Sequence, residues 1–210
     1  ALTEPDDTAV ILYTSGTTGQ PKGAELSHSN MLLNARLADS LFGHSDNDVH
    51  LIVLPLFHSF GQTVQMNAGF YTAATISLLP RFDPDAVLAI MQRDNVTFFA
   101  GVPTMYWSLL NYPAADKYDL AKISDNLRLS VSGGAAMPVE VMKAFEEKFK
   151  VNIQEGYGLS ETSPVASFNR LDRERKPGSV GLPVWGVEMK VVDELDADLP
   201  QGELGEIVIR

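Results

Sequence analysis

The alternation of short apolar runs with helical patterns is the feature of this sequence that most constrains its fold. The runs are bounded by turn residues, as the buried strands of a mostly parallel sheet are. They lie at residues 10–13, 50–54, 75–79, 96–100 and 127–131. Strands that alternate with helices along a chain build layered α/β domains. We therefore expect an α/β fold in which a mostly parallel sheet is flanked by helices.

Residues that are typical of helix starts lie between these apolar runs. Ser29 has the chemistry of a helix N-cap, which predicts a helix over residues 31–41. Asp83 followed by Pro84 predicts a second helix that runs to about Arg93.

Two further prolines, Pro103 and Pro138, have the position of a first helical residue. The pattern over residues 138–150 alternates apolar residues on one side with glutamate and lysine on the other. The apolar face consists of Val139, Met142, Phe145 and Phe149. This pattern predicts an amphipathic helix that lies on a sheet.

The character of the chain changes at about residue 179, where glycine, proline and alternating residues become frequent. Residues 188–193 and 206–210 have the alternation of antiparallel strands, and the stretch between them is rich in turn residues. We expect residues 1–178 to form the α/β core and residues 179–210 to begin a smaller β subdomain.

Composition excludes several classes of protein. The chain has 16 lysines and arginines against 27 acidic residues, a net charge of −11, which argues against a nucleic-acid partner. There are no cysteines, so disulfides and thiolate sites are excluded. No apolar run approaches the roughly 18–20 residues that span a bilayer, and residues 1–8 do not resemble a signal peptide. We expect a cytoplasmic protein whose membrane contacts, if any, are peripheral.

The stretch from Tyr13 to Gly23 combines hydroxyl side chains, glycines and one lysine directly after an expected strand. Glycines let backbone N–H groups approach an anion, hydroxyls add donors, and Lys22 supplies a positive charge. These properties predict a phosphate-binding loop. A flexible surface turn is the alternative, but it would not explain the preceding strand or the Pro-Lys-Gly that follows.

Two well-known phosphate loops do not match this stretch. A Walker A loop needs Gly-Lys-Ser/Thr in succession, whereas Gln20 and Pro21 separate Gly19 from Lys22. The dinucleotide-binding fingerprint needs a glycine spacing that the stretch does not have.

At this point the sequence resembles the adenylate-forming superfamily, which contains acyl- and aryl-CoA synthetases, firefly luciferase and the adenylation domains of peptide synthetases. The resemblance covers the whole chain and rests on segments that occur in the family's order. Besides the phosphate loop these are Phe57-His58, Ser132-Gly-Gly-Ala135, Gly156-Tyr-Gly-Leu-Ser-Glu-Thr162 and Gly178-Ser-Val-Gly-Leu-Pro183. The resemblance implies a nucleotide- and acyl-binding core.

The resemblance also implies roles for residues of the Gly156–Thr162 segment. Tyr157 would flank the adenine, Ser160 would contact the α-phosphate and Glu161 would help to hold Mg²⁺. An aromatic ring offers a nucleobase a stacking face, and a carboxylate oxygen is a ligand that Mg²⁺ prefers. Threonine is commoner than serine at the position of Ser160, but a serine hydroxyl donates equally well. Read alone, the segment is more typical of a structured turn with a helix cap.

Further residues are implied in the nucleotide site and in catalysis. Small residues after the expected strand 127–131 would let adenine lie against the backbone, although a tight strand-to-helix turn also needs small residues. The residues implied to bind the nucleotide are Thr14, Ser15, Gly16, Thr17, Thr18, Gly19, Lys22, Gly133, Gly134, Ala135, Glu155, Gly156, Tyr157, Gly158 and Ser160. The residues implied in catalysis are Lys22, His58, Ser160 and Glu161.

His58 looks like the family's histidine beside the acyl carboxylate. Without that context, a histidine in an apolar stretch is more often a core residue. We expect it to position the substrate, because an ionised carboxylate that attacks the α-phosphate needs no general base.

The implied reaction has two halves. The carboxylate displaces pyrophosphate from MgATP and forms an acyl-AMP, and the thiol of coenzyme A then displaces AMP. The chain therefore resembles part of an AMP-forming acid–thiol ligase, with ATP, Mg²⁺ and coenzyme A as its implied cofactors and co-substrates.

The substrate acid is expected to be apolar. Small residues and aromatic residues alternate between Ser59 and Thr104, and Arg81 and Arg93 are the only cationic side chains in that stretch. The amino-acid sequence of this stretch is most similar to that of bacterial long- or medium-chain fatty-acid CoA ligases, so a fatty acid is the first substrate that we predict. An aryl acid is the alternative substrate, and close helix–sheet packing is the alternative reason for the small residues.

The chain lacks parts that the family has. The resemblance implies a longer N-terminal region, an aspartate beyond the Glu206–Arg210 strand, and a C-terminal domain with the adenylation lysine. We expect a fragment that cannot complete the reaction alone. A non-catalytic nucleotide-binding or interaction module is the rival interpretation, and a serine hydrolase is disfavoured because no Gly-x-Ser-x-Gly elbow is present.

Overall fold

The computed structural model of the protein describes residues 2–15 and 19–210. Three residues of the predicted phosphate loop, Gly16, Thr17 and Thr18, lie outside the described residues. No helix in the described ranges combines the length and apolar composition that crossing a membrane requires.

A seven-stranded sheet forms the centre of the fold. In spatial order its strands are β4 (Thr75–Leu78), β3 (Val49–Ile52), β5 (Phe98–Gly101), β6 (Leu129–Ser132), β7 (Ile153–Gly158), β8 (Val165–Phe168) and β9 (Leu182–Pro183). The pairs from β4 to β7 are parallel, and β8 and β9 are added antiparallel at one edge. The predicted fold class, a mostly parallel sheet flanked by helices, is confirmed.

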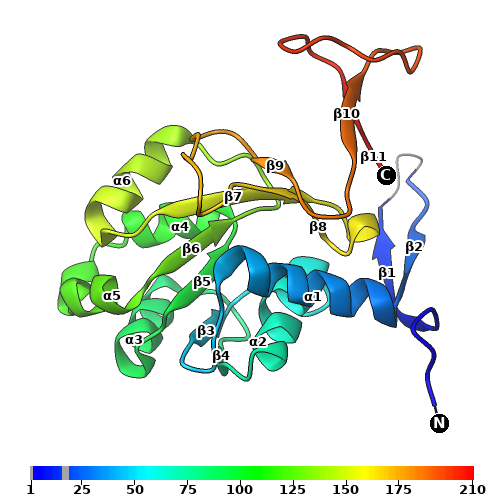
Figure 1. Ribbon diagram of the computed structural model, residues 1–210. Coiled ribbons are helices and arrows are strands. Elements are labelled where there is room, and N and C mark those ends of the chain that lie inside the picture. Colours follow the sequence, from blue (N-terminus) through cyan, green and yellow to red (C-terminus); the bar gives the residue numbers. More distant parts are fainter. Residues whose placement is uncertain (1, 16–18) are drawn as a thin grey trace.

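Helices cover both faces of this sheet (Figure 1). The α-helices are α1 (His28–Phe42), α2 (Ala68–Tyr71), α3 (Pro84–Asp94), α4 (Pro103–Leu110), α5 (Leu120–Asn126) and α6 (Val139–Phe149). The helices of other types are the π-helix η1 (Phe60–Asn67) and the 3₁₀ helices η2 (Ala115–Lys117) and η3 (Ser160–Thr162).

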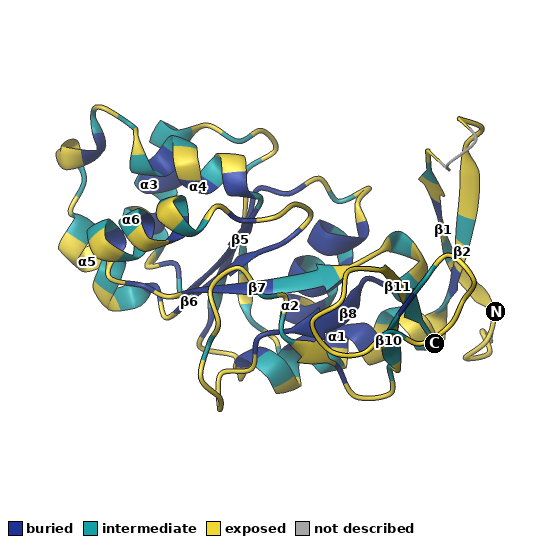
Figure 2. Ribbon diagram, turned by 90° about the horizontal axis from the view of Figure 1, so that it is seen from above, coloured by how far each residue is buried: buried dark blue, intermediate teal, exposed yellow. Residues whose placement is uncertain are grey.

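Strand β5 shows why the protein has two cores. Its consecutive residues Phe98 and Phe99 are both fully buried, but strand geometry directs their side chains to opposite faces. Phe99 packs in a cluster with Tyr106 of α4, Phe145 of α6 and residues of α3. Phe98 packs in a second cluster with Phe42 of α1 and residues of η1. Figure 2 shows the central strands as the most buried part of the chain.

The predicted helix starts are confirmed for α3 and α4 and corrected for α6 and α1. Pro138 is the N-cap of α6, which begins at Val139, because the ψ of Pro138 is 126° and therefore extended. Asp83 caps α3 by accepting a hydrogen bond from the N–H of Ala86, and Pro103 begins α4. Helix α1 begins at His28, three residues before the predicted start, and Ser27, not Ser29, is its N-cap. The reason is a capping box: Ser27 accepts from the N–H of Asn30, whose side chain accepts from the N–H of Ser27.

The apolar run at 10–13 is wrongly predicted as part of the parallel sheet. It lies in β1 (Thr8–Thr14), which pairs antiparallel with β2 (Lys22–Ser27) in a separate hairpin. The connection between these strands is too short for the crossover of a dozen or more residues that parallel pairing requires. The described residues of the predicted phosphate loop, 13–15 and 19–23, lie in or next to the facing ends of β1 and β2, and β2 leads directly into α1.

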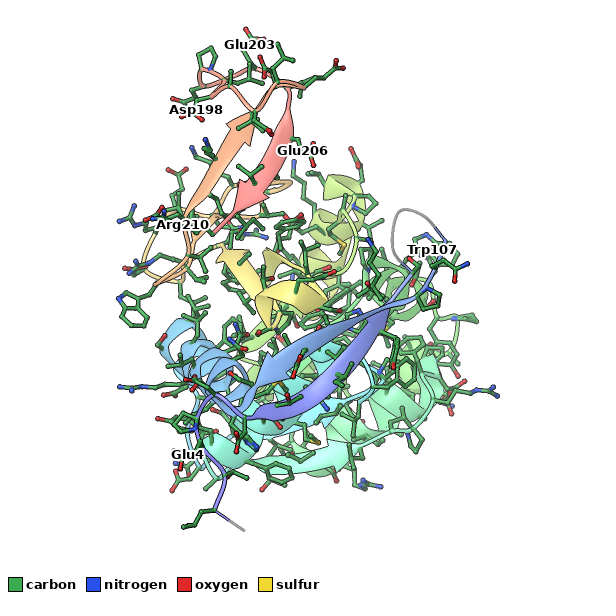
Figure 3. The ribbon with its side chains drawn as sticks, turned by 90° about the vertical axis from the view of Figure 1, so that its right-hand side faces the viewer. Glu4, Trp107, Asp198, Glu203, Glu206 and Arg210 are labelled. Atoms are coloured by element: carbon green, nitrogen blue, oxygen red, sulfur yellow. The ribbon has the colours of Figure 1, made fainter. Side chains whose placement is uncertain are left out.

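A second hairpin lies at the C-terminal end of the chain. Strands β10 (Met189–Val192) and β11 (Glu206–Ile209) pair antiparallel, as predicted for residues 188–193 and 206–210. The hairpin stands away from the central sheet, with Asp198 and Glu203 near its tip and Arg210 at its base (Figure 3). Strand β9 still belongs to the central sheet, so the domain boundary after residue 178 stays a prediction.

Candidate active site

A cavity of about 480 Å³ lies where three strands of the central sheet end. Residues that follow β3 and β6, the last residues of β7, and the end of β1 meet there. The sequence-predicted residues in its lining are Thr14, Ser15, His58, Gly133, Gly134, Gly156, Tyr157, Gly158, Ser160 and Glu161. These residues are spread over most of the chain length, and the fold brings them to one place.

The strand order explains why a cavity forms at this edge. The chain leaves β3 for β4 on one side and later returns to place β5 on the other side of β3. Helix η1, which follows β3, packs in one core, whereas α4, which follows β5, packs in the other. In open α/β sheets, ligands bind in the crevice outside the carboxyl ends of the strands at such a reversal.

His58 occupies a rigid turn between β3 and η1. Its backbone N–H donates to the carbonyl of Pro55 at 3.1 Å, and its own carbonyl accepts from the N–H of Gln62 at 3.0 Å. The imidazole Nδ1 accepts a hydrogen bond from the backbone N–H of Phe60 at 3.1 Å. The side chain is exposed and lines the cavity.

Helix η1, which follows this turn, is anchored to the sheet by a buried amide. Gln65 is fully buried, and its Nε2 donates to the carbonyl of Leu51 in β3 at 2.9 Å. Gly61 packs so closely that a Cβ there would lie 2.7 Å from the carbonyl oxygen of Pro55. A π-helix is rare and is often found at functional sites, where it redirects side chains.

The Ser132-Gly-Gly-Ala135 segment ends β6 and enters the cavity. Gly134 has a φ of +78°, a conformation that favours glycine, so the segment needs its small residues for the turn itself. Gly133 lies against the ring of Phe60, 3.2 Å from the position that a Cβ would take. Ala135 is exposed and does not line the cavity.

The Gly156–Thr162 segment begins as the end of β7 and then turns into η3. The turn closes on itself: the N–H of Leu159 donates to Thr162 Oγ1 at 2.9 Å and to the carbonyl of Pro164 at 3.1 Å. A Cβ at Gly158 would lie 1.9 Å from the Pro164 carbonyl oxygen, so only glycine permits this closure. The turn presents Ser160 and Glu161 to the cavity.

Asn34 of α1 links this turn to the helix that follows the phosphate-loop hairpin, and sequence analysis did not single it out. Its side chain is buried, donates to the carbonyl of Thr162 at 3.5 Å and accepts from the N–H of Val165 at 3.3 Å. The one available sequence signal is a polar residue at a helical position in phase with buried Ala35, Ala38 and Phe42.

Among the predicted nucleotide-binding residues that the structure describes, four do not line the cavity: Gly19, Lys22, Ala135 and Glu155. Lys22 lies in β2 opposite Thr14, with an exposed side chain next to the loop. Glu155 is buried, and its carboxylate accepts from the N–H of Gly178 at 2.8 Å. Burial raises the pKa of Glu155, while this hydrogen bond opposes the shift. Nucleotide contacts of these residues stay a prediction.

The cavity has an apolar wall that motif reasoning missed. It is formed by Phe42, Phe60, Val64, Val131, Val165 and Phe168. Phe42 and Phe168 meet edge to face with their ring centroids 4.8 Å apart. Most small residues between Ser59 and Thr104 lie elsewhere; a Cβ at Gly69, for example, would press on Ile76 and His50. Close packing therefore accounts for them at least in part.

A buried group at the opposite ends of the strands has metal-ligand chemistry. His44, Asp48 and His50 offer ligand atoms that all lie within 4.8 Å of one another. However, Arg128 donates to both carboxylate oxygens of Asp48, at 2.8 and 2.7 Å, and contacts His44 Nδ1. A guanidinium already occupies the position that a cation would need, so this group is an internal ion pair.

The electrostatics of this group follow from its burial. Burial, with further contributions from His50 and Arg128, lowers the pKa of His44 to about 3. Burial also lowers the pKa of His50. Burial opposes the ionisation of Asp48, yet hydrogen bonds from Arg128 and Thr97 hold its pKa well below its usual range. The two histidines are therefore neutral and Asp48 is charged at neutral pH.

Comparison with known proteins assigns the chain to a family. The profile of the family described as "AMP-binding enzyme" matches residues 1–210. A long-chain-fatty-acid–CoA ligase of Bacillus subtilis (strain 168) is 38% identical over 207 residues, which are 97% of this chain and 36% of that protein. A 4-coumarate–CoA ligase 2 of Petroselinum crispum is 35% identical over an alignment 218 positions long, which covers 99% of this chain and 39% of the relative.

A solved structure agrees with this assignment. ATP-bound MatB from Rhodopseudomonas palustris superposes with a TM-score of 0.89 and is 35% identical, over 99% of this chain and 40% of that chain. The chain thus spans about two fifths of the length of the proteins it matches. The predicted resemblance is confirmed: the chain belongs to the AMP-binding enzyme family, among relatives that are acyl- and aryl-CoA ligases.

Proposed function

We propose that the protein containing this chain is an AMP-forming acid–CoA ligase. The observation that carries the proposal is one cavity lined by the end of the phosphate-loop hairpin, His58, the Gly133–Gly134 turn and the Tyr157–Glu161 segment. These groups supply hydrogen-bond donors, an aromatic face and a carboxylate around one space, which is what an acyl-adenylate requires.

The first step would join the acid to the nucleotide. A carboxylate oxygen of the acid attacks the α-phosphorus of ATP, and the bond from that phosphorus to the β-phosphate oxygen breaks. The products are acyl-AMP and pyrophosphate. Ser160 would donate to an α-phosphate oxygen, and Lys22 with the loop hydroxyls would neutralise the departing pyrophosphate.

Glu161 fits a role as a Mg²⁺ ligand. Its side chain is exposed, lines the cavity and stands next to Ser160, so its oxygens can reach the phosphates that the serine would contact. A carboxylate is the oxygen ligand that Mg²⁺ uses together with phosphate groups. The ion would neutralise phosphate charge when the nucleotide is bound.

In the second step, the thiol sulfur of coenzyme A would attack the acyl carbon. The bond from that carbon to the AMP oxygen breaks, AMP leaves with the electron pair, and the thiol proton passes to solvent. Thioester and AMP are the products. Binding the acyl group in a fixed position makes this attack effectively unimolecular.

We infer that the acid has an apolar body, because part of the cavity lining is formed by aliphatic and phenylalanine side chains such as Phe60 and Val165. A fatty acid is the first candidate and is supported by the similarity to the Bacillus subtilis ligase. An aryl acid is the second candidate and is supported by the similarity to 4-coumarate–CoA ligase and by the ring pair of Phe42 and Phe168.

An acid panel tests this proposal. The protein that carries these residues is incubated with MgATP, coenzyme A and either aliphatic acids of graded length or benzoic and cinnamic acids. We expect AMP, pyrophosphate and a CoA thioester in equal amounts, with one acid class preferred. Formation of ADP and phosphate, or of AMP without any thioester, would contradict the proposal.

A further inference from the structure

We propose that the backbone N–H of Phe60 fixes His58 as the tautomer with its proton on Nε2, so that His58 serves the bound acid as a neutral hydrogen-bond donor and not as a base. The identity of the ligand rests on the proposed function. The tautomer rests on the geometry of the turn alone.

The hydrogen bond between Phe60 and His58 determines which nitrogen of the imidazole carries the proton. The N–H of Phe60 points at Nδ1 of the imidazole across 3.1 Å. An amide N–H has a hydrogen to donate and no lone pair to offer, so Nδ1 must accept. A neutral imidazole has one donor and one acceptor nitrogen, so the proton lies on Nε2.

The turn holds the ring in this orientation. The backbone of His58 is tied at both ends, because its N–H donates to Pro55 and its carbonyl accepts from Gln62. Gly61 closes the turn against the Pro55 carbonyl, and Gln65 anchors the following helix to β3. The first N–H groups of a helix lack partners within it, and His58 satisfies the one on Phe60.

The second ring nitrogen is left for a ligand. Nε2 of His58 has no hydrogen-bond partner among residues 2–15 and 19–210, and the side chain lines the cavity beside Gly133 and Tyr157. A carboxylate and an acyl-phosphate offer only acceptor oxygens, so an N–H donor matches them. In this tautomer Nε2 has no free lone pair, and therefore it cannot accept a proton from the coenzyme A thiol.

The ¹⁵N chemical shifts of the His58 ring show directly which nitrogen carries the proton. The protein is labelled with ¹⁵N-histidine, and the His58 signals are assigned by their loss in His58→Asn. Spectra are recorded at about pH 8, where an ordinary imidazole is neutral. We expect an unprotonated, imine-type shift for Nδ1 and a protonated, pyrrole-type shift for Nε2. The opposite pattern, or averaged shifts that report both tautomers, would overturn the proposal.

Two substitutions distinguish the donor role of Nε2 from the hydrogen bond that Nδ1 accepts from the N–H of Phe60. His58→Gln can place an N–H₂ group near the position of Nε2, whereas His58→Asn can only replace the acceptor at Nδ1. Since hydrogen bonds to charged groups contribute about 1.5–3 kcal/mol, kcat/KM for the acid should fall roughly 10- to 100-fold more in His58→Asn than in His58→Gln. Equal losses, or a larger loss in His58→Gln, would contradict the donor role.

His28→Asn is the matched control, because His28 is exposed at the start of α1 and does not line the cavity. Its activity and the His58 signals should be unchanged. If the unsubstituted protein activates no acid at all, the proposed function fails, but the NMR result still decides the tautomer. If acids are activated and the NMR shows a proton on Nδ1, only the present inference fails.

Discussion

The side-chain oxygen of Asn34 accepts a hydrogen bond from the backbone N–H of Val165 at 3.3 Å, across 131 positions of sequence. The same side chain donates to the carbonyl of Thr162, so one buried amide joins α1 to the last residue of η3 and to the first residue of β8. Helix α1 directly follows the phosphate-loop hairpin. Asn34 therefore connects the helix that follows the hairpin with the segment that follows Glu161, and nucleotide contacts are predicted for both the hairpin loop and Glu161's neighbour Ser160.

Replacing Asn34 by alanine is expected to destabilise the protein. The buried N–H of Val165 would lose its partner, which costs about 1–3 kcal/mol in free energy of unfolding. Denaturant unfolding measures this cost. Leu32→Ala, an exposed position on the same helix, should change stability by no more than about 0.5 kcal/mol. If Asn34→Ala behaves like Leu32→Ala, the bridge does not contribute to stability.

Two glycines of the site should respond differently to alanine. A Cβ at Gly158 meets the Pro164 carbonyl oxygen at 1.9 Å, so the backbone must move, whereas the nearest neighbour of a Cβ at Gly133 is the ring of Phe60 at 3.2 Å. Overpacking costs roughly 1–3 kcal/mol, and we expect Gly158→Ala at the upper end and Gly133→Ala below the lower end. Thermal unfolding of both variants tests the order, and a reversed order would show that the closed turn is not rigid.

Acid should weaken the fold through the buried His44 group. The pKa of His44 is about 3 in the folded chain and about 6.5 when unfolded, so the unfolded state binds the extra proton first. The contribution of neutral His44 to the free energy of unfolding is complete above about pH 6.5. It is lost as the pH falls toward 3, at about 1.4 kcal/mol per pH unit. His50 shifts in the same direction and adds to the loss.

Unfolding free energies measured at about pH 7 and pH 5 test this account. The decrease between them should be smaller by roughly 2 kcal/mol in His44→Gln than in the unsubstituted protein. His28→Gln replaces an exposed histidine and should leave the pH dependence unchanged. An unaltered decrease in His44→Gln would mean that His44 is protonated in the folded state.

Glu161→Gln tests the proposed Mg²⁺ contact. The substitution keeps the size of the side chain but removes its charge, and Mg²⁺ prefers carboxylate oxygens. We expect the Mg²⁺ concentration for half-maximal acid activation to rise by about 10-fold, since loss of one such contact costs about 1.4 kcal/mol or more. A purely structural role for Glu161 would lower stability and leave the Mg²⁺ dependence as it was.

The sequence predicted the parallel core well, because buried strands and capped helices leave local signals. The run around Phe98 and the Asp83–Pro84 helix start are examples, and both lie where predicted. The run at 10–13 has the same composition as a core strand, and only its pairing partner distinguishes it. Pairing is a long-range property, so a local pattern does not determine it.

The site, like the fold, has one part that the sequence predicts and another part that it does not. Glycine-rich segments such as Gly156–Gly158 are visible in the sequence because backbone conformation and close approach require particular residues. Phe42 and Phe168 line the cavity and Asn34 supports the turn beside it, but none of the three could be predicted there, because an apolar or amide side chain in the interior has the same local pattern whether or not it lies near a site. Their role follows from tertiary packing alone.

The most direct test of the central claim is exchange of labelled pyrophosphate into ATP by the protein that carries this chain, measured with and without a carboxylic acid and before coenzyme A is added. Formation of an acyl-AMP is reversible and releases pyrophosphate, so the account predicts exchange that depends on the acid and is lost in Ser160→Ala combined with Glu161→Gln. Exchange that occurs equally without acid, or no exchange with any aliphatic or aryl acid, would contradict it.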